Sequence, residues 1–282
     1  MGGVQLIRQT DQAPSGGLLF SLTPGPATRT TPALVGGSTS GFAQLSALYE
    51  LLRGVSLQPR LVMPASVVAT LPHQSTVAAL PELPGVTEGH ESWQALESAG
   101  VVIMGLDMKL SSQLQIVLSR LLRIVSPAVI CTDELASMFR IEPELLQRPN
   151  CIPCFAVATI RRNALGLQIP LRLSEVRGVF GVADLLKSMD ATGPLVLSYD
   201  ADNLYTYIRS SDVMIHTPVS SQDHSRAQRL WLAALLMTYW ARGQEGDPVE
   251  LVRLAHYLVY QLIAQPTNST RTDAAGVLAL FG

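Results

Sequence analysis

A glycine-rich turn at residues 36–41, which reads GGSTSG, is the first stretch whose residue types could bind a ligand. It joins an apolar, strand-like run to an amphipathic helix predicted over 42–53. Gly36, Gly37 and Gly41 let the backbone approach a ligand closely, and free N–H groups at a helix start favour an anion. The turn lacks the Gly-Lys-Ser/Thr ending of a P-loop and the spacing of GxGxxG. Ligand binding and simple tight-turn geometry therefore both stay open.

Two of the three cysteines, Cys151 and Cys154, form a single CxxC pair, CIPC; the third is Cys131. A zinc site needs two further ligands at a suitable spacing, and the sequence offers none. A redox CxxC normally opens a helix, whereas this one runs into the strand-like CFAVA at 154–158. We therefore predict ordinary cysteines leading into a strand, no metal site and a reducing compartment.

The histidines and acidic residues of the C-terminal half have structural explanations. His256 lies on a largely apolar helix and is predicted to be a hydrogen-bonded core histidine, while His216 closes a strand and has no metal partner in the sequence. His224 is compatible with a solvated side chain, and its neighbour Asp223 with the N-cap of a helix. The Asp-Ala-Asp run at 200–202 lies between two strands, which favours a polar turn over a divalent-metal site.

The composition is that of a globular chain with a large core. Of 282 residues, 48% are hydrophobic and 15% charged, with 20 basic and 22 acidic side chains. A formal net charge of −2 indicates neither a nucleic-acid-binding nor a membrane-binding surface. The longest apolar stretch, at 230–241, is too short to span a bilayer. We expect a cytoplasmic protein without nucleic-acid or membrane partners.

Aromatic residues gather on a helix that is apolar nearly all round, at Trp231, Tyr239 and Trp240. Such a helix lies in a core or in a subunit interface. Because so hydrophobic a chain carries so few charges, part of its surface is expected to be covered in a homo-oligomer.

Short apolar runs alternate with amphipathic segments along most of the chain. Strands are predicted at 33–37, 60–63, 99–105, 127–132 and 154–158, and helices at 42–53 and 110–124. This alternation predicts an α/β fold with a mainly parallel central sheet and helices on both faces. Ligands bind such sheets beyond the carboxyl ends of the strands.

The two ends of the chain differ from this pattern. Three short strands in 193–218 predict a small meander, and two helices follow at about 223–242 and 247–264. Residues 1–30 are expected to form an irregular leader, and residues 31–282 a single domain.

The order of these segments resembles the ADP- or ATP-dependent NAD(P)H-hydrate dehydratases, members of the ribokinase-like superfamily. ALVGGSTSGFAQLSALYELLRGVSLQPRLVMPAS is similar to that family's first strand, Gly-Gly-Ser turn, Ala/Leu-rich helix and second strand. Three further segments are similar to parts of that family. They are LPELPGV (80–86), which is similar to its Pro-Glu segment, GVVIMGLD (100–107), similar to a strand with a glycine-rich end, and PAVICTDELASMF (127–139), similar to a strand with an acidic end. PLVLSYDADNLYTYI resembles its strand pair around Lys-Gly. The resemblance covers residues 33–264 and rests on segment order and hydrophobic pattern.

Several motif positions depart from that family. Its Gly-Thr-Gly-Asp turn reads Ser220, Ser221, Gln222 and Asp223 here, so the carboxylate is kept and both glycines are lost. Ser198-Tyr199 stands in place of Lys-Gly, and of an Asp-Ala-Asp pair only Asp133 is kept. A distorted anion-binding turn would weaken phosphoryl transfer directly, because that reaction depends on positioning and charge stabilisation.

The resemblance implies two alternatives and leaves open whether the chain is an enzyme. In the first, ADP or ATP with Mg²⁺ drives the repair of hydrated NADH or NADPH. Asp223 is then the catalytic base, and the other implied contacts are Ser220, Ser221 and Gln222 for phosphate and Gly36, Gly37, Ser38, Gly41, Gly105 and Asp133 for substrate. In the second, the fold persists without the chemistry, as a nucleotide-binding or subunit-interaction protein. A related small-molecule kinase is a more distant third.

Overall fold

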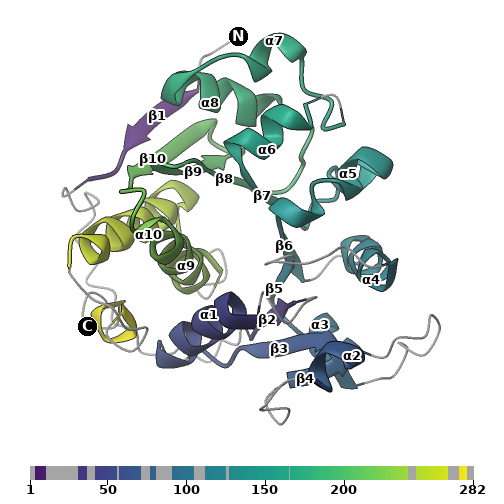
Figure 1. Cartoon of the computed structure of the whole chain (residues 1–282). Helices are drawn as coiled ribbons and strands as arrows, with labels where there is room; N and C mark the ends of the chain where they lie inside the picture. The colour runs from purple at the N-terminus through teal and green to yellow at the C-terminus, as the bar shows by residue number, and fades with distance from the viewer. Residues whose placement is uncertain are drawn as a thin grey trace.

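The computed structural model describes residues 4–10, 31–36, 42–55, 57–70, 77–80, 91–104, 112–124, 127–164, 166–240, 246–265 and 273–277. Within them, ten strands form one sheet in the order β1-β10-β9-β8-β7-β6-β5-β2-β3-β4 (Figure 1). The strands are β1 (Gln5–Arg8), β2 (Pro32–Val35), β3 (Arg60–Pro64), β4 (Val77–Leu80), β5 (Val101–Met104), β6 (Ala128–Thr132), β7 (Cys151–Ala156), β8 (Leu195–Tyr199), β9 (Asn203–Ile208) and β10 (Val213–Pro218).

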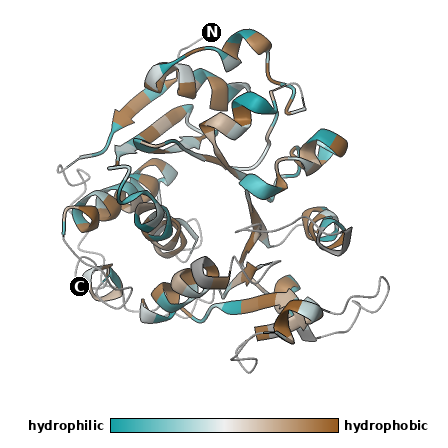
Figure 2. Ribbon diagram, in the orientation of Figure 1, coloured by the Kyte–Doolittle hydropathy of each residue, from teal (hydrophilic) through white to brown (hydrophobic). Residues whose placement is uncertain are grey.

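Helices cover both faces of this sheet (Figure 1). They are α1 (Phe42–Gly54), α2 (Ala65–Val68), α3 (Glu91–Glu97), α4 (Ser112–Arg123), α5 (Met138–Ile141), α6 (Val157–Arg162), α7 (Leu171–Ser174), α8 (Gly178–Ser188), α9 (His224–Leu235) and α10 (Pro248–Ile263). Helices α1, α9 and α10 pack on one face, and α3, α4, α5, α6 and α8 on the other. Figure 2 shows the hydrophobic strands between these two helical layers.

The pairing of the strands confirms the predicted α/β class with a mainly parallel sheet. Every described neighbouring pair is parallel except those of β9, which runs antiparallel to both β8 and β10. The predicted meander is therefore β8-β9-β10. Strands β2 and β5 are buried along their whole length, which explains why they are continuously apolar rather than alternating.

Strand β1 is a finding that sequence reasoning did not anticipate, since it lies within the segment expected to be an irregular leader. It pairs in parallel with β10, and its flanking bonds run from Gln5 N–H to Asp212 O (3.0 Å) and from Gln9 N–H to His216 O (2.9 Å). Four residues are too few for a periodic signal, and the strand exists because β10 offers a free edge.

In the described residues no helix is long and apolar enough to cross a membrane.

The C-terminal helices begin where the sequence predicted. Asp247 caps α10 by accepting a bond from Val249 N–H (3.0 Å), and Pro248 takes the first helical position. Helix α9 begins after Asp223 and continues into a π-helical turn at Leu236–Trp240. Both helices pack on the same face of the sheet as α1, and they place the start of α9 near the carboxyl end of β8.

Candidate functional site

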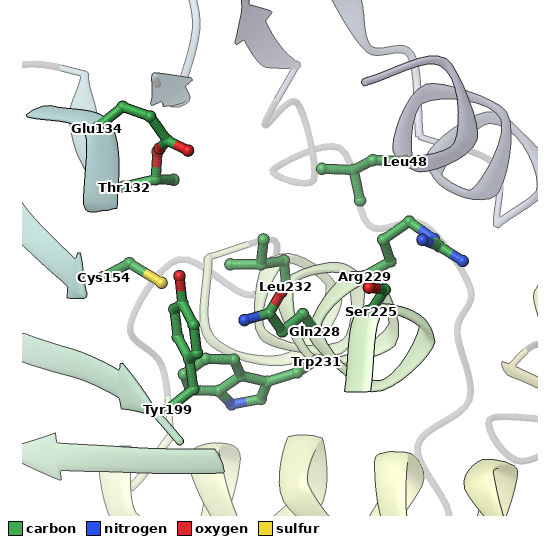
Figure 3. Close-up of a pocket in the computed structure, with 10 residues that line it drawn as sticks. All are labelled: Leu48, Thr132, Glu134, Cys154, Tyr199, Ser225, Gln228, Arg229, Trp231 and Leu232. Atoms are coloured by element: carbon green, nitrogen blue, oxygen red, sulfur yellow. The ribbon is translucent and has the colours of Figure 1, made fainter. Parts of the chain in front are cut away.

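A cavity of about 90 Å³ lies at the carboxyl ends of β6, β7 and β8, against the first turns of α9 and the side of α1 (Figure 3). The described residues that line it are Leu48, Thr132, Glu134, Cys154, Tyr199, Ser225, Gln228, Arg229, Trp231 and Leu232. This is the edge at which parallel α/β sheets bind ligands, because the loops that follow successive strands meet there.

The cavity has a polar side and an apolar side. Figure 3 shows the Glu134 carboxylate, the Cys154 thiol and the Tyr199 hydroxyl facing it from the strand ends. Leu48 and Leu232 face it from α1 and α9, and the Trp231 indole forms part of its floor. A ligand here would meet hydrogen-bonding groups at one end and hydrocarbon at the other.

Two carboxylates, Asp133 and Glu134, act on the polar side of the cavity. Burial raises the pKa of the Cys154 thiol far above its usual range, and the nearby Asp133 and Glu134 carboxylates raise it further. The pKa of Tyr199 is likewise raised, first by burial and then by Cys154, Asp133 and Glu134. Both groups are therefore uncharged at neutral pH, and they act as neutral hydrogen-bonding groups rather than as nucleophiles.

Asp133 follows β6 directly, and its carboxylate holds two neighbouring elements together. Oδ1 accepts from Ala156 N–H (2.6 Å) at the end of β7, and Oδ2 accepts from the Thr159 hydroxyl (3.0 Å) in α6. Arg162 in turn donates to Thr159 Oγ1 (3.3 Å). Because these bonds join β6 to the β7–α6 junction, Asp133 has a clear structural role, and it is not among the cavity-lining residues.

The turn that precedes α9 has ordinary backbone geometry. In the described residues positive φ angles occur at Gln168, Asp212 and Gly178, and not between 220 and 223. The N–H of Asp223 donates to Ser220 O (3.0 Å), and that of Gln222 to Ser220 Oγ (3.4 Å). Two amides that an open anion-binding turn would direct outward are thus used within the turn.

Asp223 is the N-cap residue of α9, but its side chain makes no capping hydrogen bond. Its backbone carbonyl accepts the first helical bond, from Ala227 N–H (2.8 Å). Residues 220–222 are exposed and Asp223 is half-buried, beside the cavity rather than in its lining. The residues predicted to bind phosphate, 220–222, and the predicted base, Asp223, therefore lie together beside the cavity. The side chains that line the cavity come from other positions.

The predicted substrate turn can be described only at Gly36. Its N–H donates to Val62 O (3.1 Å), and a Cβ added there would lie 2.2 Å from Leu45 Cδ1. A side chain at this position would have to displace the buried Leu45, so glycine fits the close packing of β2 on α1, which agrees with the tight-turn interpretation. Gly37, Ser38, Gly41 and Gly105 lie outside the described residues.

Sequence reasoning missed most of the cavity lining. The sequence marks Tyr199 only as a departure from Lys-Gly, and Gln228 carries no motif signal at all. Glu134 adjoins the predicted Asp133 and could have been found from its place after a strand. The rest of the lining depends on which face of α9 the fold turns toward the sheet.

Beneath the cavity, His256 is confirmed as a hydrogen-bonded core histidine. Its Nε2 lies 2.8 Å from Thr206 Oγ1 and accepts from Trp231 Nε1 (3.3 Å), and its Nδ1 lies 2.8 Å from Thr217 Oγ1. Because the indole N–H can only donate, Nε2 must be the acceptor and the proton lies on Nδ1. Burial, with a smaller contribution from His216, lowers the pKa of His256 to about 3.

The other polar candidates also have structural partners. Asp200 accepts bonds from Asp202 N–H (2.9 Å), Asn203 N–H (2.8 Å) and the Tyr205 hydroxyl (2.7 Å), as predicted for a polar turn. The three cysteines are free and buried. No group of three or more His, Cys, Asp or Glu side chains placed to hold a metal ion occurs in the described part of the chain.

Comparison with solved structures identifies the fold. A ribokinase-like superfamily protein from Enterococcus faecalis V583 superposes with a TM-score of 0.64 at 10% identity, over 100% of this chain and 96% of that one. The chain has the ribokinase-like fold. Sequence comparison alone finds no relative: no family model and no curated protein matches.

Two further structures agree with this assignment. A Streptococcus mutans protein of unassigned function has a TM-score of 0.62 at 10% identity, over 92% of each chain. The ADP/ATP-dependent NAD(P)H-hydrate dehydratase of Bacillus subtilis, co-crystallised with ATP and Mg²⁺, has a TM-score of 0.53 at 13% identity, over 94% of this chain and 96% of that one. The resemblance inferred from segment order is therefore confirmed at the level of the fold.

Proposed function

We propose that this chain is a nucleotide-binding ribokinase-like protein in which phosphoryl transfer through the 220–223 turn has been lost. The observation that carries the proposal is the closed form of that turn. Gln222 and Asp223 donate their amide protons to Ser220 instead of presenting them to a phosphate. A transferring phosphoryl group gains most of its stabilisation from hydrogen-bond donors fixed around it. Loss of these donors therefore reduces phosphoryl transfer more than it reduces nucleotide binding.

Nucleotide binding is supported by two features. The first N–H groups of α9, which begins at His224, have no intrahelical acceptors, and a helix N-terminus attracts anions. The fold is also that of a dehydratase co-crystallised with ATP and Mg²⁺. A Mg²⁺ ion carried by the nucleotide would neutralise phosphate charge, and Asp223 is the carboxylate of this turn that could help to hold it.

A second candidate function, NAD(P)H-hydrate dehydratase activity, is favoured by one specific observation. The Asp223 side chain makes no capping hydrogen bond. A general base needs a carboxylate that is free to accept a proton from the substrate hydroxyl. In this alternative the 220–223 turn would open when the nucleotide binds.

One experiment separates these functions. Titration calorimetry of the full chain with ADP, ATP, NADH and NADPH is followed by recovery of the reduced-nicotinamide absorbance from hydrated NADH plus nucleotide and Mg²⁺. Binding without recovery is expected. Recovery that disappears in Asp223→Asn but persists in the neighbouring control Asp202→Asn would establish the dehydratase instead. Absence of any nucleotide binding would overturn both functions.

A further inference from the structure

Large apolar side chains gather on the outside of one short segment, residues 171–180, which runs from α7 into the first turn of α8 and is named the α7–α8 segment. The exposed large apolar residues in the described part of the chain are Ile116, Ile141, Leu171, Val176 and Phe180. The last three belong to the α7–α8 segment, and Phe180 is 76% exposed. Helix α7 packs against α8, at the end of the molecule opposite β4 (Figure 1). Single exposed apolar residues are ordinary, whereas a group of them on two packed elements indicates an interaction surface.

The α7–α8 segment is held in place by contacts with the rest of the protein. Arg161 Nη2 donates to Val176 O (2.7 Å), and Val176 packs so closely on α8 that a Cβ added at Gly181 would lie 2.4 Å from Val176 Cγ1. Leu173 and Val179 pack against the core, so the exposed side chains between them are not needed to fill it. A surface that is already ordered loses less conformational entropy on binding a partner.

The charged groups around this segment are mostly basic. Residues 161–180 carry arginine at 161, 162, 172 and 177, and Glu175 as the single acid. Burial and then Arg177 lower the pKa of Arg161, against a smaller opposite effect of Asp200, so the guanidinium groups of Arg161 and Arg177 lie near each other. Within the described residues, neither Arg172 nor Arg177 takes part in an ion pair. An acidic partner would therefore meet available positive charge beside the apolar side chains.

The residue types distinguish between the possible occupants of this surface. A second copy bound through two-fold symmetry would bring the same arginines against one another. An anionic lipid surface would meet the like charge of Glu175, and residues 161–180 contain no lysine. Phenylalanine and arginine without lysine are instead typical of the centre of a protein–protein interface.

We infer that the α7–α8 segment binds an acidic amphipathic helix of a partner protein. The apolar face of that helix would lie against Leu171, Val176 and Phe180, and its carboxylates would pair with Arg172 and Arg177. A guanidinium can donate two parallel hydrogen bonds to one carboxylate, which fixes the orientation of the bound helix. The inference is independent of the proposed function, because the segment contributes no residue to the cavity beside α9.

The probe is a blocked synthetic peptide of about four helical turns, with leucine at i, i+3, i+4 and i+7 and glutamate beside these positions. One control peptide has lysine in place of glutamate, and a second has the same composition with its leucines no longer on one face. Fluorescence anisotropy of each labelled peptide measures its binding to the full chain. The acidic amphipathic peptide is expected to bind, more weakly as the salt concentration rises, and the two controls are expected not to bind.

Substitutions at exposed positions then locate the bound peptide. Phe180→Ala should weaken binding about tenfold, as truncation of an aromatic anchor does. Arg172→Gln and Arg177→Gln should each weaken it by up to about fivefold, the range of exposed charge pairs. The matched controls are Ile116→Ala and Arg123→Gln, which change exposed residues of α4 and should leave the affinity unchanged. Because Phe180 is exposed, Phe180→Ala should also leave the urea denaturation midpoint unchanged.

Four results would overturn the inference. They are no binding of the acidic peptide, equal binding of the lysine peptide, equal binding of the peptide with scattered leucines, and equal losses in Phe180→Ala and Ile116→Ala. Sedimentation with vesicles of phosphatidylserine and phosphatidylcholine tests the lipid alternative, and vesicle binding that Phe180→Ala abolishes would assign the segment to a lipid surface instead. A dimer that Phe180→Ala dissociates in sedimentation velocity would assign it to a second copy of the chain.

Discussion

Helix α9 links two polar regions, the buried cluster around His256 and the exposed turn before the helix, which differ in how far their side chains are hydrogen-bonded. Around His256, the ring nitrogens, two threonine hydroxyls and the Trp231 N–H are all hydrogen-bonded and buried. At the start of the helix, the Asp223 side chain makes no capping bond, and exposed residues precede it. The difference shows that a chemically capable residue is informative about function only once its hydrogen bonds have been assigned.

The largest expected effect lies in the buried region. Replacing His256 by Leu leaves the Thr206 and Thr217 hydroxyls and the Trp231 N–H without their buried partner, so we expect unfolding free energy to fall by about 3 kcal/mol. Urea denaturation measures the loss. Adding Thr206→Val and Thr217→Val should recover part of it, because apolar partners need no hydrogen bonds. A loss below about 0.5 kcal/mol would mean that the two regions do not differ in this way.

Lowering the pH should reduce the unfolding free energy through the same buried histidine, without any mutation. Burial lowers the folded-state pKa of His256 from its ordinary 6.5 to about 3. Between these two pH values His256 is therefore protonated in the unfolded chain and neutral in the folded chain. Stability is therefore lost as pH falls from 6.5 toward 3, by about 1.4 kcal/mol per pH unit from this residue. Comparing urea denaturation of wild type and His256→Gln at several pH values isolates that slope. If the unfolding free energies of wild type and His256→Gln changed equally with pH, His256 would not be a buried neutral histidine.

Asp133 provides an intermediate case, because it lies at the site edge but is bonded like a core residue. Asp133→Ala removes the acceptor of Ala156 N–H and of the Thr159 hydroxyl, and should cost about 2 kcal/mol of unfolding free energy. The exposed Asp202→Ala serves as the control. If the loss at Asp133 is no larger than that at Asp202, its bonds are not what joins β6 to α6.

The smallest effect is expected at Asp223. Since its side chain makes no capping bond, Asp223→Asn should change unfolding free energy by less than about 0.5 kcal/mol. Urea denaturation tests this, and nucleotide titration of the same variant tests whether the carboxylate matters to binding. A loss of 1 kcal/mol or more would place Asp223 with the structural residues instead.

The candidate site was only partly predictable from the sequence. Segment order points to Asp223 and its turn, and residue type to Gly36, but none of these residues is in the cavity lining. The closure of the turn was not predictable, because the local backbone path decides whether Ser220 O and Oγ can accept the amide protons of Asp223 and Gln222. Nothing in the sequence around Cys154, Tyr199 and Gln228 indicates a shared site, and they share a cavity only because β7, β8 and α9 meet at one edge.

The sequence by itself determined the α/β class, the continuously apolar parallel strands, the Asp247 cap of α10 and the core position of His256. Each of these depends on local periodicity or residue chemistry, which a single segment carries. Only the tertiary structure decided the pairing of β1 with β10, the engagement of Asp133 and the cavity beside α9. Those features join residues far apart in the chain, so the packing of complete elements fixes them.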